Sequence, residues 1–161
     1  MILSATYIHP LYKAVYFTYR TLIKKLLFTG NEIYEATLDP YMQYTCGYWL
    51  KAKNLDDAQI DKLDLIARKL NLKPGMRVLD IGCGWGMLCK FLAERYKVEC
   101  VGVTISKEGA EYSRNACKGL PVEIRIQDYR DINDSFDRIV VVGMIEHVGP
   151  KNYREFFKVK F

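Results

Sequence analysis

The sequence of 161 residues has few of the side chains that bind metals or form disulfides. It contains two histidines, His9 and His147, and its cysteines form no C-x-x-C pair, so a structural zinc site is not expected. The chain also lacks the apolar core and cleavage pattern of a secretory signal peptide. With an odd number of cysteines, these features predict reduced thiols in a cytoplasmic protein. We expect three of the five cysteines to be small buried apolar residues: Cys89, Cys100 and Cys117.

Acidic residues are absent from the first 30 positions, although the whole chain carries 19 of them. Basic residues alternate there with aromatic and aliphatic ones from Leu11 to Phe28, without an apolar run long enough to span a bilayer. Two interpretations stay open for this segment: an amphipathic helix on an anionic membrane surface, or an ordinary packing helix. Because the rest of the chain is nearly neutral, nucleic-acid binding is not predicted.

A glycine-rich segment, RVLDIGCGWG, runs from Arg77 to Gly86. Its first five residues form an apolar run too short for a helix, and apolar residues at helical spacing follow from Met87, so we expect a strand, a turn and a helix. Glycines allow the backbone of such a turn to approach a ligand. The spacing G-x-G-x-G after Asp80 differs from the G-x-G-x-x-G of dinucleotide sites and favours S-adenosylmethionine over NAD. A turn without a ligand is the plainer alternative.

Helical and strand patterns alternate along the rest of the chain. We expect helices over 56–72, 87–93 and 107–117, another beginning at 151, and strands over 77–81, 98–103, 122–126 and 139–142. This alternation predicts an α/β fold with a Rossmann-like, doubly wound parallel sheet in the order 3-2-1-4. A ligand would lie at the carboxyl ends of the strands, beside the switch point between strands 1 and 4. The last strand leaves an apolar edge, which predicts a truncated product, a sequence fragment or a partner that covers the edge.

Three segments resemble one known family. They are Leu38–Trp49 (LDPYMQYTCGYW), Leu72–Gly86 (LKPGMRVLDIGCGWG), and the pair formed by Gln127–Asp131 (QDYRD) and Gly143–Tyr153 (GMIEHVGPKNY). With the sequence GVTIS at 102–106, they resemble the cyclopropane-fatty-acyl-phospholipid synthases and the related mycolic acid cyclopropane synthases. The similarity extends from about residue 30 to about residue 157.

The resemblance implies a class I S-adenosylmethionine-dependent methyltransferase fold, C-terminally truncated. We divide the chain into an N-terminal helical arm with an active-site cap, residues 1–55, and an incomplete cofactor-binding core, residues 56–161. The implied reaction transfers a methylene unit from S-adenosylmethionine to the cis double bond of an unsaturated phospholipid acyl chain, with bicarbonate as the base. The implied location is the cytoplasm, peripherally at the inner face of the membrane, and a homo-oligomer is left open.

The resemblance also implies roles for individual residues. Gly82, Gly84 and Gly86 would line the methionine part of the cofactor, and Tyr44 would reach it from the cap. Asp80 would also belong to the cofactor-binding residues. The ribose and adenine would lie against Thr104, Ile105, Gln127 and Asp128; the less favoured alternative for Asp128 is a turn residue that caps the end of a strand. Cys46 and Glu146 would hold the bicarbonate. We expect His147 to be a structural histidine.

Two other functions stay open at this stage. A related lipid or small-molecule methyltransferase would methylate without closing a ring and would tolerate Cys46→Ala. A non-catalytic remnant would associate with membranes or with a full-length homologue and turn nothing over.

Overall fold

The computed structural model describes residues 31–158, so the basic segment from Leu11 to Phe28 lies outside the described residues. The chain divides into two units after Thr37. Of the first unit, the structure describes helix α2 (Glu32–Thr37), in which the Thr37 hydroxyl donates to the Ile33 carbonyl at 2.7 Å. The second unit begins at Leu38 and contains the predicted cap segment as well as the α/β core.

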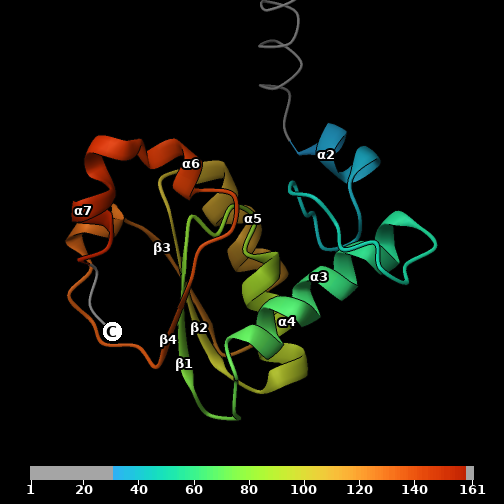
Figure 1. Cartoon of the computed structure of the whole chain (residues 1–161), viewed down its shortest axis with the longest axis horizontal. Coiled ribbons are helices and arrows are strands. Elements are labelled where there is room, and N and C mark those ends of the chain that lie inside the picture. The colour runs from blue at the N-terminus through green and yellow to red at the C-terminus, as the bar shows by residue number, and fades with distance from the viewer. Residues whose placement is uncertain (1–30, 159–161) are drawn as a thin grey trace, which may run out of the picture. The chain divides into compact units, whose positions relative to one another are not determined.

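Four parallel strands form the sheet of the second unit, in the order β3 (Val122–Ile126), β2 (Glu99–Thr104), β1 (Arg77–Ile81) and β4 (Arg138–Val140). The predicted order 3-2-1-4 is confirmed (Figure 1). In the central register, Asp80 of β1 lies opposite Gly102 of β2 and Val140 of β4. Among the described strands, β4 pairs only with β1, so it is an edge strand as the sequence predicts.

Helices cover both faces of the sheet (Figure 1). The longer ones lie on one face: α3 (Leu55–Lys69), α4 (Met87–Tyr96) and α5 (Lys107–Ala116). The other face carries short helices, α6 (Ile145–Val148) and α7 (Tyr153–Phe156), and two 3-10 turns, Tyr129–Asp131 and Pro150–Asn152. None of the helices within residues 31–158 has the length and apolar character needed to cross a membrane.

Helix α3 is delimited by its local sequence. At its N-terminus the Asn54 side chain accepts a hydrogen bond from the Asp57 amide at 2.8 Å, which satisfies one of the free donors of the first turn. The helix ends at Lys69, three residues before the predicted end, because Asn71 adopts a left-handed backbone with φ of 49°.

The core consists of two apolar clusters, one on each face of the sheet. Helices α3 and α4 supply Leu63, Phe91 and Leu92 to the first cluster, where they pack against Val78 of β1. The second cluster contains Leu79, Ile81, Val101, Val103 and Phe136. The cysteines at 83, 89, 100 and 117 are all buried, which confirms the prediction for the last three.

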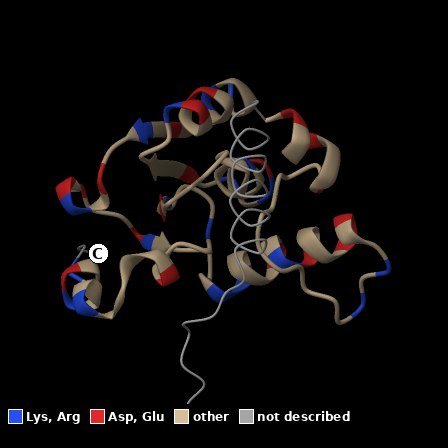
Figure 2. Ribbon diagram, turned by 90° about the horizontal axis from the view of Figure 1, so that it is seen from above, with Lys and Arg blue, Asp and Glu red and all other residues tan. Residues whose placement is uncertain are grey.

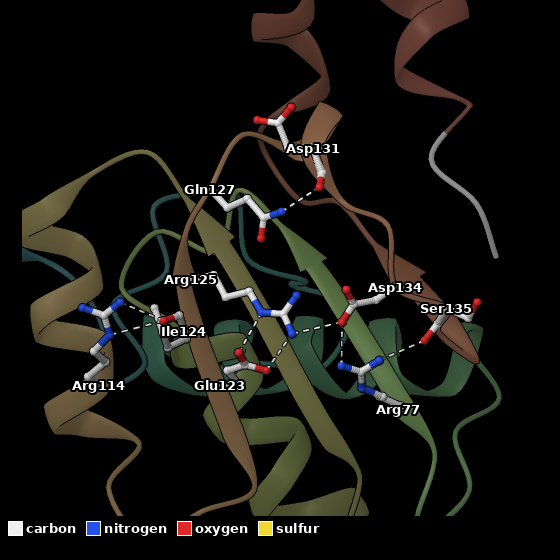
Figure 3. A network of polar contacts seen from close by, with 9 residues as sticks. All are labelled: Arg77, Arg114, Glu123, Ile124, Arg125, Gln127, Asp131, Asp134 and Ser135. Atoms are coloured by element: carbon white, nitrogen blue, oxygen red, sulfur yellow. Dashed lines mark hydrogen bonds and ion pairs between the residues drawn. The ribbon is translucent and has the colours of Figure 1, made fainter.

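An ion-pair network crosses the sheet from β1 to β3 (Figure 3). The Asp134 carboxylate lies 2.9 Å from the Arg77 guanidinium and 3.0 Å from that of Arg125, which also pairs with Glu123. These two arginines hold the pKa of Asp134 below its usual range. The network ties the loop before β4 to two strands. Elsewhere, basic and acidic residues are interspersed along the described elements (Figure 2).

Candidate cofactor and active site

The glycine turn after β1 is held tightly against its neighbours. The amides of Gly82 and Cys83 both donate to the Val103 carbonyl of β2, at 2.9 and 3.0 Å. A Cβ atom on Gly82 would lie 2.8 Å from Cγ of Met144, and one on Gly86 would lie 2.7 Å from Cβ of Ser113. Both glycines also have positive φ, so neither position accepts a side chain without strain.

Two cavities adjoin this turn at the carboxyl ends of the strands. The first has a volume of about 220 Å³ and lies among residues 42–45, the turn itself and residues 142–143. The second, of about 360 Å³, lies among the ends of β1, β2 and β3 and residues of α6. Gly82 and Gly84 line both cavities. The turn is therefore a common wall, against which an elongated ligand can lie with one end in each cavity.

Asp80 lines the first cavity from the end of β1. Its side chain is buried, and burial raises its pKa to about 7, an effect that a hydrogen bond from the Cys89 thiol partly opposes. The carboxyl group therefore changes between its protonated and ionised forms near neutral pH. A positively charged ligand group in this cavity would favour its ionised form.

The second cavity is lined by the residues predicted to surround the ribose and adenine. Thr104 is buried, and its hydroxyl accepts from the Ser106 amide at 3.2 Å, whereas Ile105 is 82% exposed. The side-chain amide of Gln127 donates to the Asp131 carbonyl at 2.9 Å (Figure 3), which orders the loop after β3. The cavity thus combines apolar walls with a few polar groups.

Asp128 lines the same cavity and also caps the following 3-10 turn. Its Oδ1 accepts from the Arg130 amide at 2.9 Å, and its Oδ2 lies 2.6 Å from the Arg130 guanidinium. The hydrogen bond from the Arg130 side chain lowers the pKa of Asp128 to about 2, so the carboxylate is ionised at neutral pH. The capping role expected as the alternative is present. It does not exclude contact with a ligand, because a carboxylate has acceptor sites beyond these bonds.

The loop that carries Tyr44 and Cys46 is shaped by a buried carboxylate. Asp39 accepts hydrogen bonds from the amides of Tyr41 and Gln43, at 2.8 and 2.7 Å. Tyr44 lines the first cavity and is 72% exposed, and its ring meets Trp85 edge-on at a centroid distance of 6.5 Å. Cys46 is exposed and is not among the residues that line either cavity.

The segments that carry Cys46 and Glu146 meet at Gly143. A Cβ atom on Gly143 would lie 2.6 Å from Cγ2 of Thr45 and 3.8 Å from Oε1 of Glu146. Glu146 itself is exposed on α6. The structure thus brings the neighbour of Cys46 close to Glu146.

Other residues line the cavities although sequence reasoning did not select them. His147, expected to be structural, is exposed and lines the second cavity together with Met144. Trp85 lines the first cavity. Its place inside the glycine motif is a signal that could have found it, whereas Met144 reaches the turn through tertiary packing that no local pattern encodes.

A glycine turn after the first strand, this strand order and cavities at the carboxyl ends of the strands are typical of doubly wound nucleotide-binding folds. Among these folds, the G-x-G-x-G spacing of the turn indicates the S-adenosylmethionine-dependent methyltransferase class. Residues 19–161 match the family model described as mycolic acid cyclopropane synthetase, and the chain belongs to this family.

Two kinds of relative support this assignment. The chain is 59% identical over 130 residues to cyclopropane-fatty-acyl-phospholipid synthase of Escherichia coli (strain K12), a match that covers 81% of this chain and 34% of the relative. The crystal structure of mycolic acid cyclopropane synthase CmaA1 complexed with SAH and CTAB has a TM-score of 0.77 and 34% identity, covering 81% of this chain and 47% of that one. The cyclopropane synthase MmaA2 from Mycobacterium tuberculosis has a TM-score of 0.76 and 34% identity, covering 80% and 47%. The chain thus spans about a third of the E. coli relative and about half of these two structures.

Proposed function

We propose that this chain carries the cofactor-binding part of a cyclopropane-fatty-acyl-phospholipid synthase. The reaction would transfer a methylene unit from S-adenosylmethionine to the cis double bond of an unsaturated phospholipid acyl chain. The observation that carries this proposal is the glycine turn as a common wall of two cavities, one beneath Tyr44 and one beside Asp128.

The residues present fit S-adenosylmethionine. Its methionine part would lie in the first cavity, against Asp80, Tyr44 and the backbone of Gly82 and Gly84, while Gly86 allows the turn to close on α5. Its ribose and adenine would lie in the second cavity, which is lined by Thr104, Ile105, Gln127 and Asp128. The ionised Asp128 carboxylate can accept a hydrogen bond from the adenine amino group.

When bound, S-adenosylmethionine supplies an electrophilic methyl group. An alkene is a weak nucleophile, so the protein must hold the double bond in line with that group at close range. Tyr44 and Trp85 present aromatic rings beside the first cavity, and their π faces can stabilise positive charge that develops on the acyl chain.

Ring closure requires removal of one proton from the transferred methyl group. We propose that Cys46 and Glu146 hold bicarbonate, which would supply the base. Support for this role comes from the approach of both segments to Gly143.

We further propose that the loop after Cys46 contacts the phospholipid surface, at the cytoplasmic face of the membrane. Trp49 is 55% exposed and Leu50 is 72% exposed, and the exposed Lys51 and Lys53 follow them directly. The Tyr48 amide donates to the Ala58 carbonyl at 2.8 Å, so the loop is tied to α3. Aromatic and aliphatic side chains next to lysines suit the interface of an anionic bilayer.

Mass spectrometry of acyl chains tests the proposed reaction. The purified 161-residue chain would be incubated with S-adenosylmethionine, bicarbonate and vesicles of cis-unsaturated phospholipid, with the E. coli relative as the positive control. The proposal predicts a gain of one methylene with loss of the double bond, and a large loss of product in Cys46→Ala. A methylated product without a ring would favour a different methyltransferase. No product beside an active relative would contradict turnover by this chain alone.

A further inference from the structure

A buried lysine lies beneath the loop of Tyr44 and Cys46. Lys62, in the middle of α3, is 8% exposed, and its ammonium donates a hydrogen bond to the Thr45 hydroxyl at 2.8 Å. One turn earlier, the buried Gln59 side chain donates to the Thr45 carbonyl, also at 2.8 Å. Two polar side chains of one helix therefore hold a single loop residue, one by its side chain and the other by its backbone.

The position of Thr45 decides where its neighbours lie. Thr45 is flanked by Tyr44, which lines the first cavity, and by Cys46, and its methyl group packs against Gly143. A shift of Thr45 would move both neighbours and open the contact with the segment of Glu146. Burying the ammonium group of a lysine costs free energy, because the group is strongly hydrated in water. The neutral Gln59 already holds the Thr45 carbonyl, so the fixing of the loop does not by itself explain a charged residue at position 62.

The charges around Lys62 indicate what its ammonium does. Burial lowers the pKa of Lys62 to about 8, and two groups of the loop, the Asp39 carboxylate and the Cys46 sulfur, act in the opposite direction. Asp39 is engaged by two backbone amides. Because Cys46 and Glu146 are both acidic groups, a cation within reach would offset the repulsion between Glu146 and an anionic base held beside it.

We propose that Lys62 is a positioning residue of the methyl-transfer site: through Thr45 it fixes Tyr44 and Cys46, and its ammonium provides the positive charge that an anion held beside Cys46 requires. This inference rests on the proposed function for the identity of the anion. The position of the loop and the charge next to Cys46 can be measured without turnover.

Alkylation of Cys46 by iodoacetamide measures both features, because Cys46 is exposed and the other four cysteines are buried. The variant Lys62→Met keeps the length of the side chain and removes its charge, Lys62→Arg keeps the charge, and Lys69→Met removes an exposed lysine of the same helix as a matched control. The rate would be followed by mass spectrometry of the full chain. Alkylation restricted to Cys46 would show that a variant remains folded.

The expected result is alkylation about fivefold slower in Lys62→Met near pH 7, since a nearby cation favours the reactive thiolate. The difference should disappear well above pH 8, where Lys62 loses its proton. Lys62→Arg should restore most of the rate, and Lys69→Met should match the wild type. Equal rates for Lys62→Met and the wild type at every pH, or a difference that does not change with pH, would overturn the proposal.

Calorimetric titration with S-adenosylmethionine separates this inference from the proposed function. If Lys62 positions Tyr44, Lys62→Met should bind the cofactor more weakly than the wild type and than Lys69→Met. A wild-type chain that binds no cofactor would contradict the proposed function and leave the alkylation result standing. If the wild type and Lys62→Met bind the cofactor equally well and are alkylated at the same rate, the role of Lys62 alone is overturned.

Discussion

The Cys89 thiol donates a hydrogen bond to the Asp80 carboxylate across 3.6 Å inside the core. It links the end of β1 to the first turn of α4, so it spans the glycine turn between them. One thiol is a weak donor, and it does not offset the burial of the carboxyl group, whose pKa rises to about 7. The first cavity is therefore lined by an acidic group that is held in an unfavourable environment.

Replacing Asp80 with asparagine should stabilise the unliganded chain above pH 7. Between the usual carboxyl pKa and about 7, the folded state keeps a proton that the unfolded chain releases, so the free energy of unfolding falls as the pH rises through this window. The fall is about 1.4 kcal/mol per pH unit. Urea unfolding at several pH values should show this slope in the wild type and not in Asp80→Asn. If the free energy of unfolding had the same pH dependence in the wild type and in Asp80→Asn, the raised pKa of Asp80 would be contradicted.

Replacing Gly86 with alanine should cost more stability than replacing Gly119. Both glycines have positive φ, but nothing lies within 4 Å of a Cβ on Gly119, whereas one on Gly86 would meet Ser113 at 2.7 Å. We expect a loss of about 1 kcal/mol for Gly119→Ala and about 3 kcal/mol for Gly86→Ala in urea unfolding. Equal losses would mean that α5 moves aside and that the turn is not held as tightly as described.

Asp128 should contribute to cofactor binding independently of its pairing with Arg130. Asp128→Ala removes the carboxylate, whereas Arg130→Gln leaves it and removes only the ion pair. Since Asp128 lines the second cavity, we expect affinity for S-adenosylmethionine to fall about tenfold in Asp128→Ala, the loss of one charge-assisted hydrogen bond. Arg130→Gln should change it little. Equal losses in calorimetric titrations would show that Asp128 acts through its ion pair with Arg130 and not by contacting the cofactor.

Local patterns in the sequence were sufficient to predict the sheet and the glycine turn. β1 and β3 have the predicted bounds, and the strand order follows from the right-handed crossovers between parallel strands. Gly82 and Gly86 were identifiable because the backbone conformation that they require is itself local. The candidate residues of the second cavity could be predicted together for a similar reason. Thr104 is the last residue of β2 and Gln127 directly follows β3, and the carboxyl ends of parallel strands lie at one edge of the sheet.

The polar residues beneath the loop could not be predicted in the same way. Apolar residues recur at helical spacing along α3, at Ile60, Leu63 and Ile66, yet the buried residues of this helix also include Gln59 and Lys62. What buries them is a loop more than ten residues earlier in the chain, whose course depends on the amides held by Asp39. The apolar spacing of a helix predicts which side faces the sheet. It does not predict a second contact, such as the one that Gln59 and Lys62 make with Thr45.

Cyclopropane formation can be tested with S-adenosylmethionine whose transferable methyl group carries three deuterium atoms. Ring closure removes one deuteron from that group, whereas simple methyl transfer removes none. Acyl chains from vesicles of cis-unsaturated phospholipid would be analysed by mass spectrometry after incubation with the chain. If this chain forms a cyclopropane ring, the product has lost the double bond and retains two deuterium atoms. A product that retains all three would contradict ring closure.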